Sequence, residues 1–149
     1  MFEHLVYLSR VCLFDFKGAL LMALDRIPEK YLNSLSTPTL VVRNNSECLN
    51  HKIVFINELF IEEIGYSIEE IPDKNTWWVT AYPDKEYQIV AERLWELSVE
   101  SYEESQGNSI TVEAKIKTKH NGVVKYRVMS EATEHLIEGH YLVQFKKLD

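Results

Sequence analysis

Cysteine is scarce in this sequence of 149 residues, which contains only Cys12 and Cys48. The two residues lie far apart, and neither belongs to a CxxC pair of the kind that binds a metal or performs redox chemistry. Two unpaired thiols are typical of proteins from a reducing compartment. We therefore expect both cysteines to be ordinary core or surface residues, and the sequence predicts neither a disulfide nor a metal site.

Long uncharged apolar segments are also missing. The best candidate, residues 18–24, is much shorter than the roughly 18–20 residues that a membrane-spanning helix needs. A signal peptide is not predicted, because Glu3, Arg10 and Asp15 interrupt the apolar residues near the N-terminus. We therefore expect a soluble, cytoplasmic protein without a membrane span.

Basic residues are in the minority, with 16 Lys and Arg against 23 Asp and Glu and a net charge of −7. This acidic balance argues against a broad nucleic-acid-binding face. Hydrophobic residues make up 46% of the chain and charged residues 26%, which indicates a globular rather than a disordered protein. A chain of this length accommodates one domain and a flanking element.

What the sequence does contain is a strand that leads directly into a helix. Residues 53–56 are β-branched or aromatic, which favours a strand. Asn57 follows at the position where a helix needs an N-cap. The helix predicted over residues 58–64 ends at Gly65, because glycine readily adopts the left-handed conformation of a C-terminal cap.

A second short helix is predicted immediately afterwards, because Ser67 and Glu70 form a capping box and Pro72 closes the segment. The strand is thus followed by two short helices, with Asn57 as the cap of the first and Gly65-Tyr66 at its end. This order resembles the core of a PAS domain, a family of small sensory modules. The adjacent residues Trp77 and Trp78, followed by Tyr-Pro-Asp, are similar to a segment of many bacterial sensory-box PAS sequences.

A long helix is predicted over residues 85–104, with Asp84 as its N-cap. Side chains that recur at helical spacing define its apolar face. These are Tyr87, Val90, Ala91, Leu94, Trp95 and Ser98.

The N-terminal residues 1–35 are rich in helix formers, and we predict three helices, divided at Gly18 and at Pro28. Their apolar side chains need a cover, because each large one left in water forgoes roughly 1.5–3 kcal/mol. The cover could be the sheet, a second copy of the chain, or a membrane surface, which is disfavoured because basic and acidic residues balance. The strands predicted over residues 39–43 and 53–56 are apolar on both faces. We therefore expect the N-terminal helices to cover the outer face of the sheet and to form a homodimer contact.

Residues 109–119 alternate between apolar and polar side chains, which predicts a strand. We predict a three-residue turn, residues 120–122, with Gly122 in the left-handed conformation. This register pairs Ile116 with Tyr126 and keeps one face of the hairpin dry. The opposite face then carries a basic patch of Lys115, Lys117, Lys119, Lys125 and Arg127.

The last strand is predicted over residues 140–147, after a turn at Glu138 and Gly139. Its inward side chains are expected to be Tyr141, Val143 and Phe145. A two-residue turn places Glu134 opposite Val143, where the carboxyl group would need a partner or a raised pKa. The alternative is that Glu134 lies at the end of the sheet.

The PAS resemblance spans about residues 36–147. It implies an α+β fold with a five-stranded antiparallel sheet, helices across its inner face, and a cavity between them. We thus expect N-terminal flanking helices in residues 1–35 and a PAS domain in residues 36–149. The family detects small ligands, redox state or light, and signals to output domains such as those of two-component or cyclic-dinucleotide pathways. We expect a non-catalytic bacterial sensor or dimerisation module whose output domain or kinase lies elsewhere.

No cofactor is predicted. Flavin-binding members need a reactive cysteine in an Asn-Cys-Arg motif at the helix after the second strand, and neither Cys12 nor Cys48 lies there. Haem-binding members use a histidine on the long helix, and residues 85–104 contain none. The five histidines show no metal-binding spacing.

If a small molecule binds, we expect it between the helices and the inward faces of the strands. The predicted lining residues are Tyr66, Trp78, Tyr82, Val90, Leu94, Trp95, Tyr126, Val128, Tyr141 and Val143. In a competing interpretation, these side chains fill the cavity themselves and the domain only binds other proteins.

An enzyme is the alternative from a different class. A cone-shaped α+β fold of the ketosteroid-isomerase kind would need an inward carboxylate as base and a tyrosine as oxyanion donor, for which Glu134 and Tyr126 are the plausible pair. Such folds lack two short strands and paired short helices before the long helix, so the order of the elements discriminates between the two.

Overall fold

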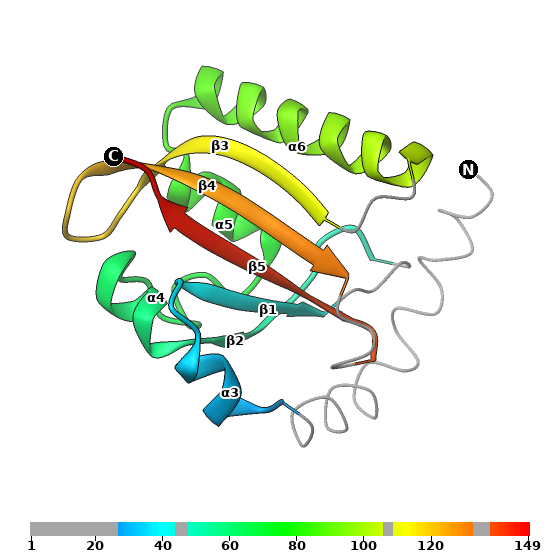
Figure 1. Cartoon of the computed structure of the whole chain (residues 1–149). Coiled ribbons are helices and arrows are strands. Elements are labelled where there is room, and N and C mark those ends of the chain that lie inside the picture. The colour runs from blue at the N-terminus through cyan, green and yellow to red at the C-terminus, as the bar shows by residue number, and fades with distance from the viewer. Residues whose placement is uncertain (1–26, 44–47, 106–108, 133–137) are drawn as a thin grey trace.

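The structure is a computed structural model, and it describes residues 27–43, 48–105, 109–132 and 138–149. The elements in chain order are α3 (Glu29–Ser34), β1 (Thr39–Arg43), β2 (Ile53–Ile56), α4 (Glu58–Glu63), α5 (Lys74–Ala81), α6 (Lys85–Ser105), β3 (Ser109–Lys117), β4 (Val123–Ala132) and β5 (His140–Lys147) (Figure 1). The helices predicted within residues 1–26 lie outside the described residues. No helix in the described ranges is both long and apolar enough to cross a membrane.

The five strands form one antiparallel sheet in the order β2-β1-β5-β4-β3 (Figure 1). The last strand, β5, therefore lies between β1 and β4 and joins the first half of the chain to the second. This arrangement confirms the predicted α+β fold with a five-stranded antiparallel sheet.

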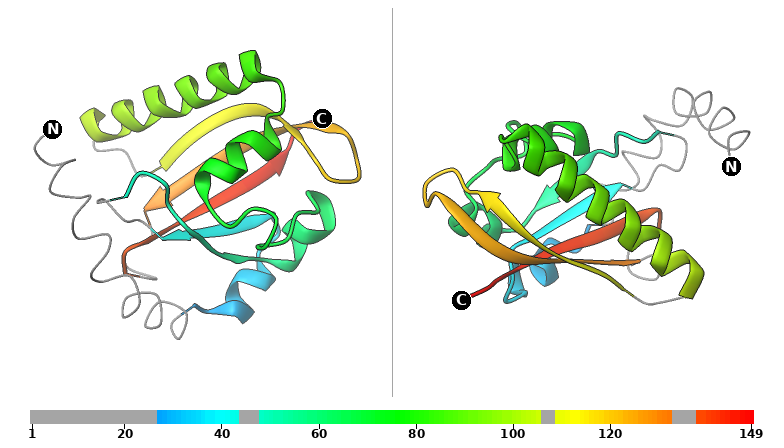
Figure 2. Two further views of the ribbon diagram at one scale, coloured as in Figure 1. Left: turned by 180° about the vertical axis from the view of Figure 1, so that it is seen from behind. Right: turned by 90° about the horizontal axis from the view of Figure 1, so that it is seen from above.

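The two faces of the sheet are covered by different helices. Helices α5 and α6 lie on the inner face, and α3 lies on the opposite side (Figure 2). On the outer face, Leu32 of α3 is fully buried against Val41, Val54 and Leu142. The third predicted N-terminal helix therefore covers part of the outer face, as expected.

Asn57 is buried and joins the two layers. Its Oδ1 atom accepts hydrogen bonds from the backbone N–H of Phe60 (3.0 Å), as the predicted N-cap of α4, and of Thr39 (2.9 Å), at the start of β1. Its Nδ2 atom donates to the backbone oxygens of Leu32 (3.0 Å) and Thr37 (3.1 Å). The residue predicted only as a helix cap thus also fastens α3 to the sheet.

The register of the β3–β4 hairpin differs from the predicted one. Ile116 pairs with Val124, and Ala114 pairs with Tyr126, so the strands are displaced by two residues. An even displacement keeps the same side chains on the inner face. Gly122 has a φ of 70° and adopts the predicted left-handed conformation, but the loop runs from residue 118 to residue 122.

Contacts with α4 account for the longer loop. The N–H of Lys119 donates to the backbone oxygen of Ile64 (2.8 Å), and Asn121 Nδ2 donates to that of Glu63 (3.3 Å). The loop thereby satisfies carbonyl groups that the end of α4 leaves without a partner in the helix. Gly65 confirms the predicted left-handed stop, with a φ of 96°.

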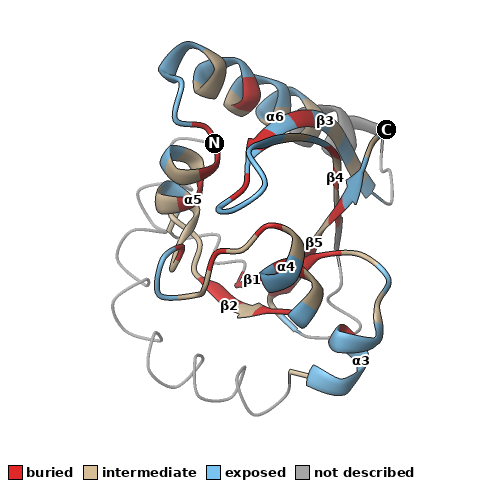
Figure 3. Cartoon of the chain, turned by 90° about the vertical axis from the view of Figure 1, so that its left-hand side faces the viewer, coloured by how far each residue is buried: buried red, intermediate tan, exposed pale blue. Residues whose placement is uncertain are grey.

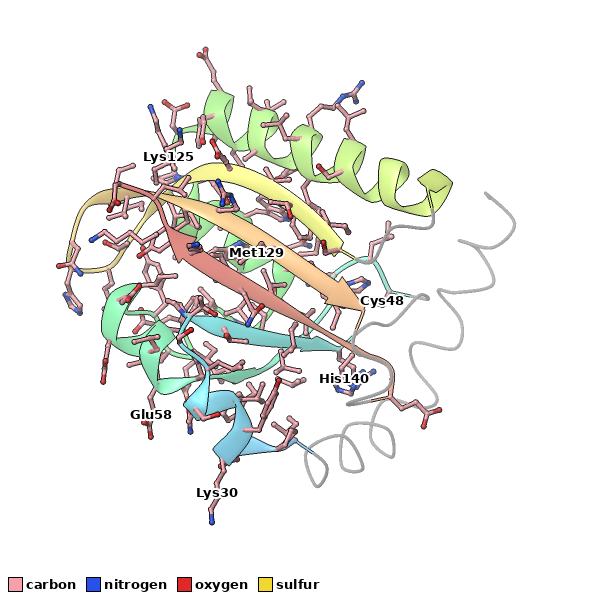
Figure 4. The ribbon with its side chains drawn as sticks, in the orientation of Figure 1. Lys30, Cys48, Glu58, Lys125, Met129 and His140 are labelled. Carbon is pink, nitrogen blue, oxygen red and sulfur yellow. The ribbon has the colours of Figure 1, made fainter. Side chains whose placement is uncertain are left out.

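The predicted basic patch is smaller and partly neutralised. Glu113 lies beside it, with its carboxylate 3.4 Å from Lys125 Nζ and 3.5 Å from Arg127 Nη2. Lys119 belongs to the loop instead and pairs with Glu70 at 2.5 Å. Lys125, which Figure 4 labels, and Arg127 lie on β4, and Glu113 lies on the neighbouring strand β3.

Three further segments differ from the sequence-based expectation. Residues 67–70 form a single turn rather than a helix, and α5 occupies residues for which no helix was predicted. The predicted pairing of Glu134 with Val143 is wrong, because β4 ends at Ala132 and Val143 pairs with Ser130. Glu134 itself lies outside the described residues.

Candidate functional site

A cavity of about 50 Å³ lies between α5, α6 and the inner face of the sheet. Side chains from both helices and all five strands line it. They are Leu40, Val42, Ile53, Lys74, Trp77, Trp78, Tyr82, Ala91, Trp95, Val112, Ala114, Val128, Tyr141 and Val143. Nearly all of them are aliphatic or aromatic, so the cavity suits the apolar part of a small molecule.

The volume of the cavity limits what it can hold. It is about a third of the roughly 150 Å³ of an apolar cavity that admits benzene. It is therefore too small for the fused rings of a flavin, and no cysteine lines it. Cys48 lies in the connection between β1 and β2 (Figure 4). Within the described ranges, no group of His, Cys, Asp and Glu side chains is arranged to hold a metal ion.

The start of α5 is fixed to the strand segment beside it. Asp73 is the N-cap of the helix and accepts a hydrogen bond from the N–H of Thr76 (2.8 Å). Asp73 also forms a β-bridge with Lys52, and the N–H of Lys74 donates to the oxygen of His51 (2.9 Å). These contacts place residues one helical turn apart, Lys74, Trp77 and Trp78, at the cavity.

Helix α6 is held close to β3. Its predicted N-cap is confirmed, because Asp84 accepts a hydrogen bond from the N–H of Tyr87 (3.0 Å). The Tyr87 hydroxyl in turn accepts one from the N–H of Lys115 (2.8 Å). Ala91 is only 3% exposed, and its small side chain lets the helix approach the sheet so that Trp95, one turn later, reaches the cavity.

Aromatic rings form a continuous wall around the cavity. The ring centroids of Trp78 and Tyr82 are 5.2 Å apart, and those of Trp77 and Phe145 are 5.5 Å apart. Such spacing is typical of favourable aromatic pairs. The contact between Trp77 and Phe145 packs α5 against β5 on this side of the cavity.

Two phenol groups add polar character. The Tyr141 hydroxyl lies 2.8 Å from Nδ1 of His51. Burial raises the pKa of Tyr141, and burial together with the nearby Tyr87 raises the pKa of Tyr82. Both phenols are therefore neutral at physiological pH and can donate or accept a hydrogen bond.

Lys74 is the only lysine, arginine, aspartate or glutamate among the described residues that line the cavity. Burial lowers the pKa of its ammonium group, and the more distant carboxylates of Glu96 and Glu92 partly oppose this shift. The surroundings of the ammonium group therefore stabilise its positive charge less than water would.

Six of the ten predicted lining residues do line the cavity, namely Trp78, Tyr82, Trp95, Val128, Tyr141 and Val143. Tyr66 and Tyr126 are buried beside it instead. The Tyr66 hydroxyl donates to the backbone oxygen of Lys117 (2.6 Å), and the Tyr126 ring packs edge-on against Phe145.

Val90 and Leu94 are not lining residues, and this part of the prediction is wrong. They are 50% and 44% exposed. Each lies one residue before Ala91 or Trp95, which corresponds to a rotation of about 100° around the helix axis. Figure 3 shows that much of α6 is exposed.

Sequence reasoning missed Lys74 and Trp77 as lining residues, because it assigned no helix to residues 74–81. A signal was present: Asp73 is a good N-cap, and lysine and tryptophan at a spacing of three share one helical face. The small residues Ala91 and Ala114 were missed as lining because small side chains suggest little contact area.

Comparisons with known proteins rest on structure alone. No protein-family model matches the sequence, and no curated protein matches it either. The structure is similar to the Rhodobacter sphaeroides LOV protein, with a TM-score of 0.57 and 10% identity over 89% of this chain and 68% of that one. It spans 66% of the RsLOV d2 variant, slightly less than two thirds of its length.

Isolated PAS domains match over more of their own length. One belongs to a LuxR-family transcriptional regulator from Burkholderia thailandensis and is described in complex with ethanol; it has a TM-score of 0.53 and 11% identity over 82% of this chain and 97% of that one. Another, from Colwellia psychrerythraea, has a TM-score of 0.52 and 17% identity over 80% and 92%. The chain therefore has the PAS fold, which it shares with these PAS and LOV domains.

Proposed function

We propose that this chain is a sensory PAS module that detects a small molecule in the cavity between α5, α6 and the sheet. The observation that carries the proposal is that the cavity is lined by both helices and by every strand. A bound molecule would therefore contact both helices and the sheet at once. It would favour those conformations of the domain that bind it best. The Burkholderia domain of the same fold is described with ethanol, a molecule of only a few heavy atoms.

We propose further that the module is non-catalytic, in preference to the isomerase alternative. No carboxylate lines the cavity among the described residues, and Tyr126, the oxyanion donor of the isomerase alternative, packs outside it. The chain order also disfavours that alternative, because β1, β2 and α4 precede the long helix α6.

The proposed partners are a second copy of the chain and an output domain or kinase in the cytoplasm of a bacterium. The support is indirect: α3 packs on the outer face of the sheet, and Ile27, just before it, packs against the same apolar cluster. A dimer contact there would link the N-terminal helices of two copies to their sheets.

Native mass spectrometry of the chain purified from its own host tests the sensor proposal. We expect a retained small mass, and a rise in melting temperature when that molecule is added back. Ala91→Leu adds bulk inside the cavity and should abolish the rise. Val90→Leu, one residue away on the exposed side of α6, should preserve it. No bound mass together with no thermal shift across a metabolite panel would favour the self-filled interaction domain.

A further inference from the structure

Lys74 has an unusual position for a lysine at the start of a helix. Lys30, near the start of α3, is exposed and extends away from the sheet (Figure 4). The side chain of Lys74 instead turns onto the cavity, beside Trp77 and Trp78. Its long apolar stem can pack on the aromatic wall, while its ammonium group brings a positive charge to an otherwise apolar space.

The acidic residues near Lys74 do not form an ion pair with it. In the described part of the chain, no carboxylate lies within 4.0 Å of its ammonium group. Glu92 and Glu96 of α6 act on it only at longer range, and Glu92 accepts a hydrogen bond from Gln88 (2.9 Å). A partly desolvated cation without a close partner is favourable for an incoming anion.

The remaining walls restrict the chemistry of that anion. The other polar groups among the lining residues are neutral: the phenols of Tyr82 and Tyr141, the latter 2.8 Å from His51 Nδ1, and the indole N–H groups of the three tryptophans. Lys74 is the one charged side chain among the described lining residues, so it matches a single negative charge better than the higher charge of a phosphate, and it would repel a cationic ligand. The cavity of about 50 Å³ also leaves little room for an aromatic ring.

We infer that the cavity binds a short aliphatic carboxylate, of about two to four carbons, with its carboxylate on Lys74 and its alkyl chain against the apolar walls. This inference rests on the proposed sensory function and names the ligand class of that same cavity. The acid supplies the close anionic partner that Lys74 lacks, and the alkyl chain buries against the aliphatic side chains of β1 and β5.

The three tryptophans of the chain, Trp77, Trp78 and Trp95, all line the cavity, so their fluorescence reports its occupancy directly. The full chain is titrated with propionate and with propionamide, a neutral molecule of nearly the same shape, at constant pH and ionic strength. We expect propionate to bind at least tenfold more tightly. Lys74→Met should weaken propionate binding about 10- to 100-fold, as expected for a lost charge-assisted hydrogen bond, and leave propionamide binding unchanged.

Lys30→Met is the matched control, because it removes an exposed lysine at the start of another helix and should leave both titrations unchanged. Lys74→Met should keep or raise the melting temperature of the ligand-free chain, because burial disfavours the charged ammonium group. Lys74→Gln provides a second variant if the methionine variant does not fold.

The outcomes separate this inference from the proposed function. Equal binding of propionate and propionamide that is unaffected by Lys74→Met would overturn the ligand class and leave the sensor proposal in place. If none of propionate, propionamide, acetate and butyrate binds, but native mass spectrometry shows a different retained mass, only the ligand class would be overturned. Binding of none, with no retained mass, would overturn both.

Discussion

At the level of single residues, Asn57 connects segments that lie far apart in the sequence. The four hydrogen bonds of its side chain reach the start of β1, the first turn of α4 and the backbone around α3, and the residue is fully buried. Each partner is a backbone group that has to be satisfied when it is removed from water. The amide is suited to this position because it carries both an acceptor and two donors.

We predict that Asn57→Ala lowers the free energy of unfolding by about 2–4 kcal/mol, because it leaves several buried backbone groups without a partner. Equilibrium unfolding in urea measures the loss. Asn33→Ala is the control: Asn33 is exposed and accepts a single hydrogen bond, from the N–H of Glu58 (2.9 Å), so its loss should be below about 1 kcal/mol. Equal losses for the two variants would contradict the central role of Asn57.

At the level of elements, the β3–β4 loop packs on the end of α4 at Gly65. This residue has a φ of 96°, and a Cβ atom added to it would lie 2.9 Å from Lys119 Cβ and 3.2 Å from the His120 ring. Gly122, at the other end of the loop, has a φ of 70°, but an added Cβ would meet nothing within 4 Å. A substitution at Gly122 therefore tests backbone strain alone, whereas one at Gly65 also tests the steric contact between α4 and the loop.

We predict that Gly65→Ala lowers the free energy of unfolding by about 2–4 kcal/mol, because conformational strain adds to displacement of the loop. Gly122→Ala should lower it by only about 1–2 kcal/mol, the strain alone. Urea unfolding compares the two variants under identical conditions. A loss for Gly65→Ala no greater than that for Gly122→Ala would show that the loop does not depend on close packing there.

The elements that could be predicted from the sequence are those with local signals. Asn57 and Asp84 were recognisable as caps, Gly65 as a helix stop, and the strands of the last hairpin by their alternation. Each of these features is decided within a few residues, so the fold followed, together with three of the cavity-lining strand residues, Val128, Tyr141 and Val143.

The remainder could not be predicted, because it depends on contacts between distant segments. The hairpin register follows from the docking of Lys119 on Ile64, which no turn rule contains. The orientation of α6 was ambiguous because apolar side chains surround much of it, and only the sheet selects Ala91 and Trp95 over Val90 and Leu94. The start of α5 had a local signal in Asp73, but the position of Lys74 at the cavity depends on how that helix packs against the sheet.

At the level of the whole molecule, the sheet separates two apolar layers with different roles. The inner layer contains the cavity, and the outer layer is the smaller cluster around Leu32, beneath α3. Because β5 contributes Val143 to the inner layer and Leu142 to the outer one, a change on one face can be transmitted to the other through a single strand. A dimer contact beyond α3 would then be sensitive to ligand binding.

This arrangement decides how the proposed dimer has to be tested. Removal of α3 would expose the apolar face of the sheet that it covers and break the hydrogen bond from Asn57 to Leu32. The truncated chain must therefore keep α3 and begin at Ile27. We predict that the full chain sediments as a dimer and residues 27–149 as a folded monomer, in sedimentation velocity with circular dichroism as the folding control.

A dimer that persists in residues 27–149 would contradict a contact through the N-terminal helices. The exposed apolar side chains of α6, including Leu94 and Leu97, form the control surface, at 44% and 52% exposure. Leu94→Gln combined with Leu97→Gln in the full chain should leave the dimer intact, because the predicted contact lies on the opposite side of the sheet. Dissociation by these two substitutions would instead assign the dimer to α6, beside the cavity, where ligand and partner would share one helix.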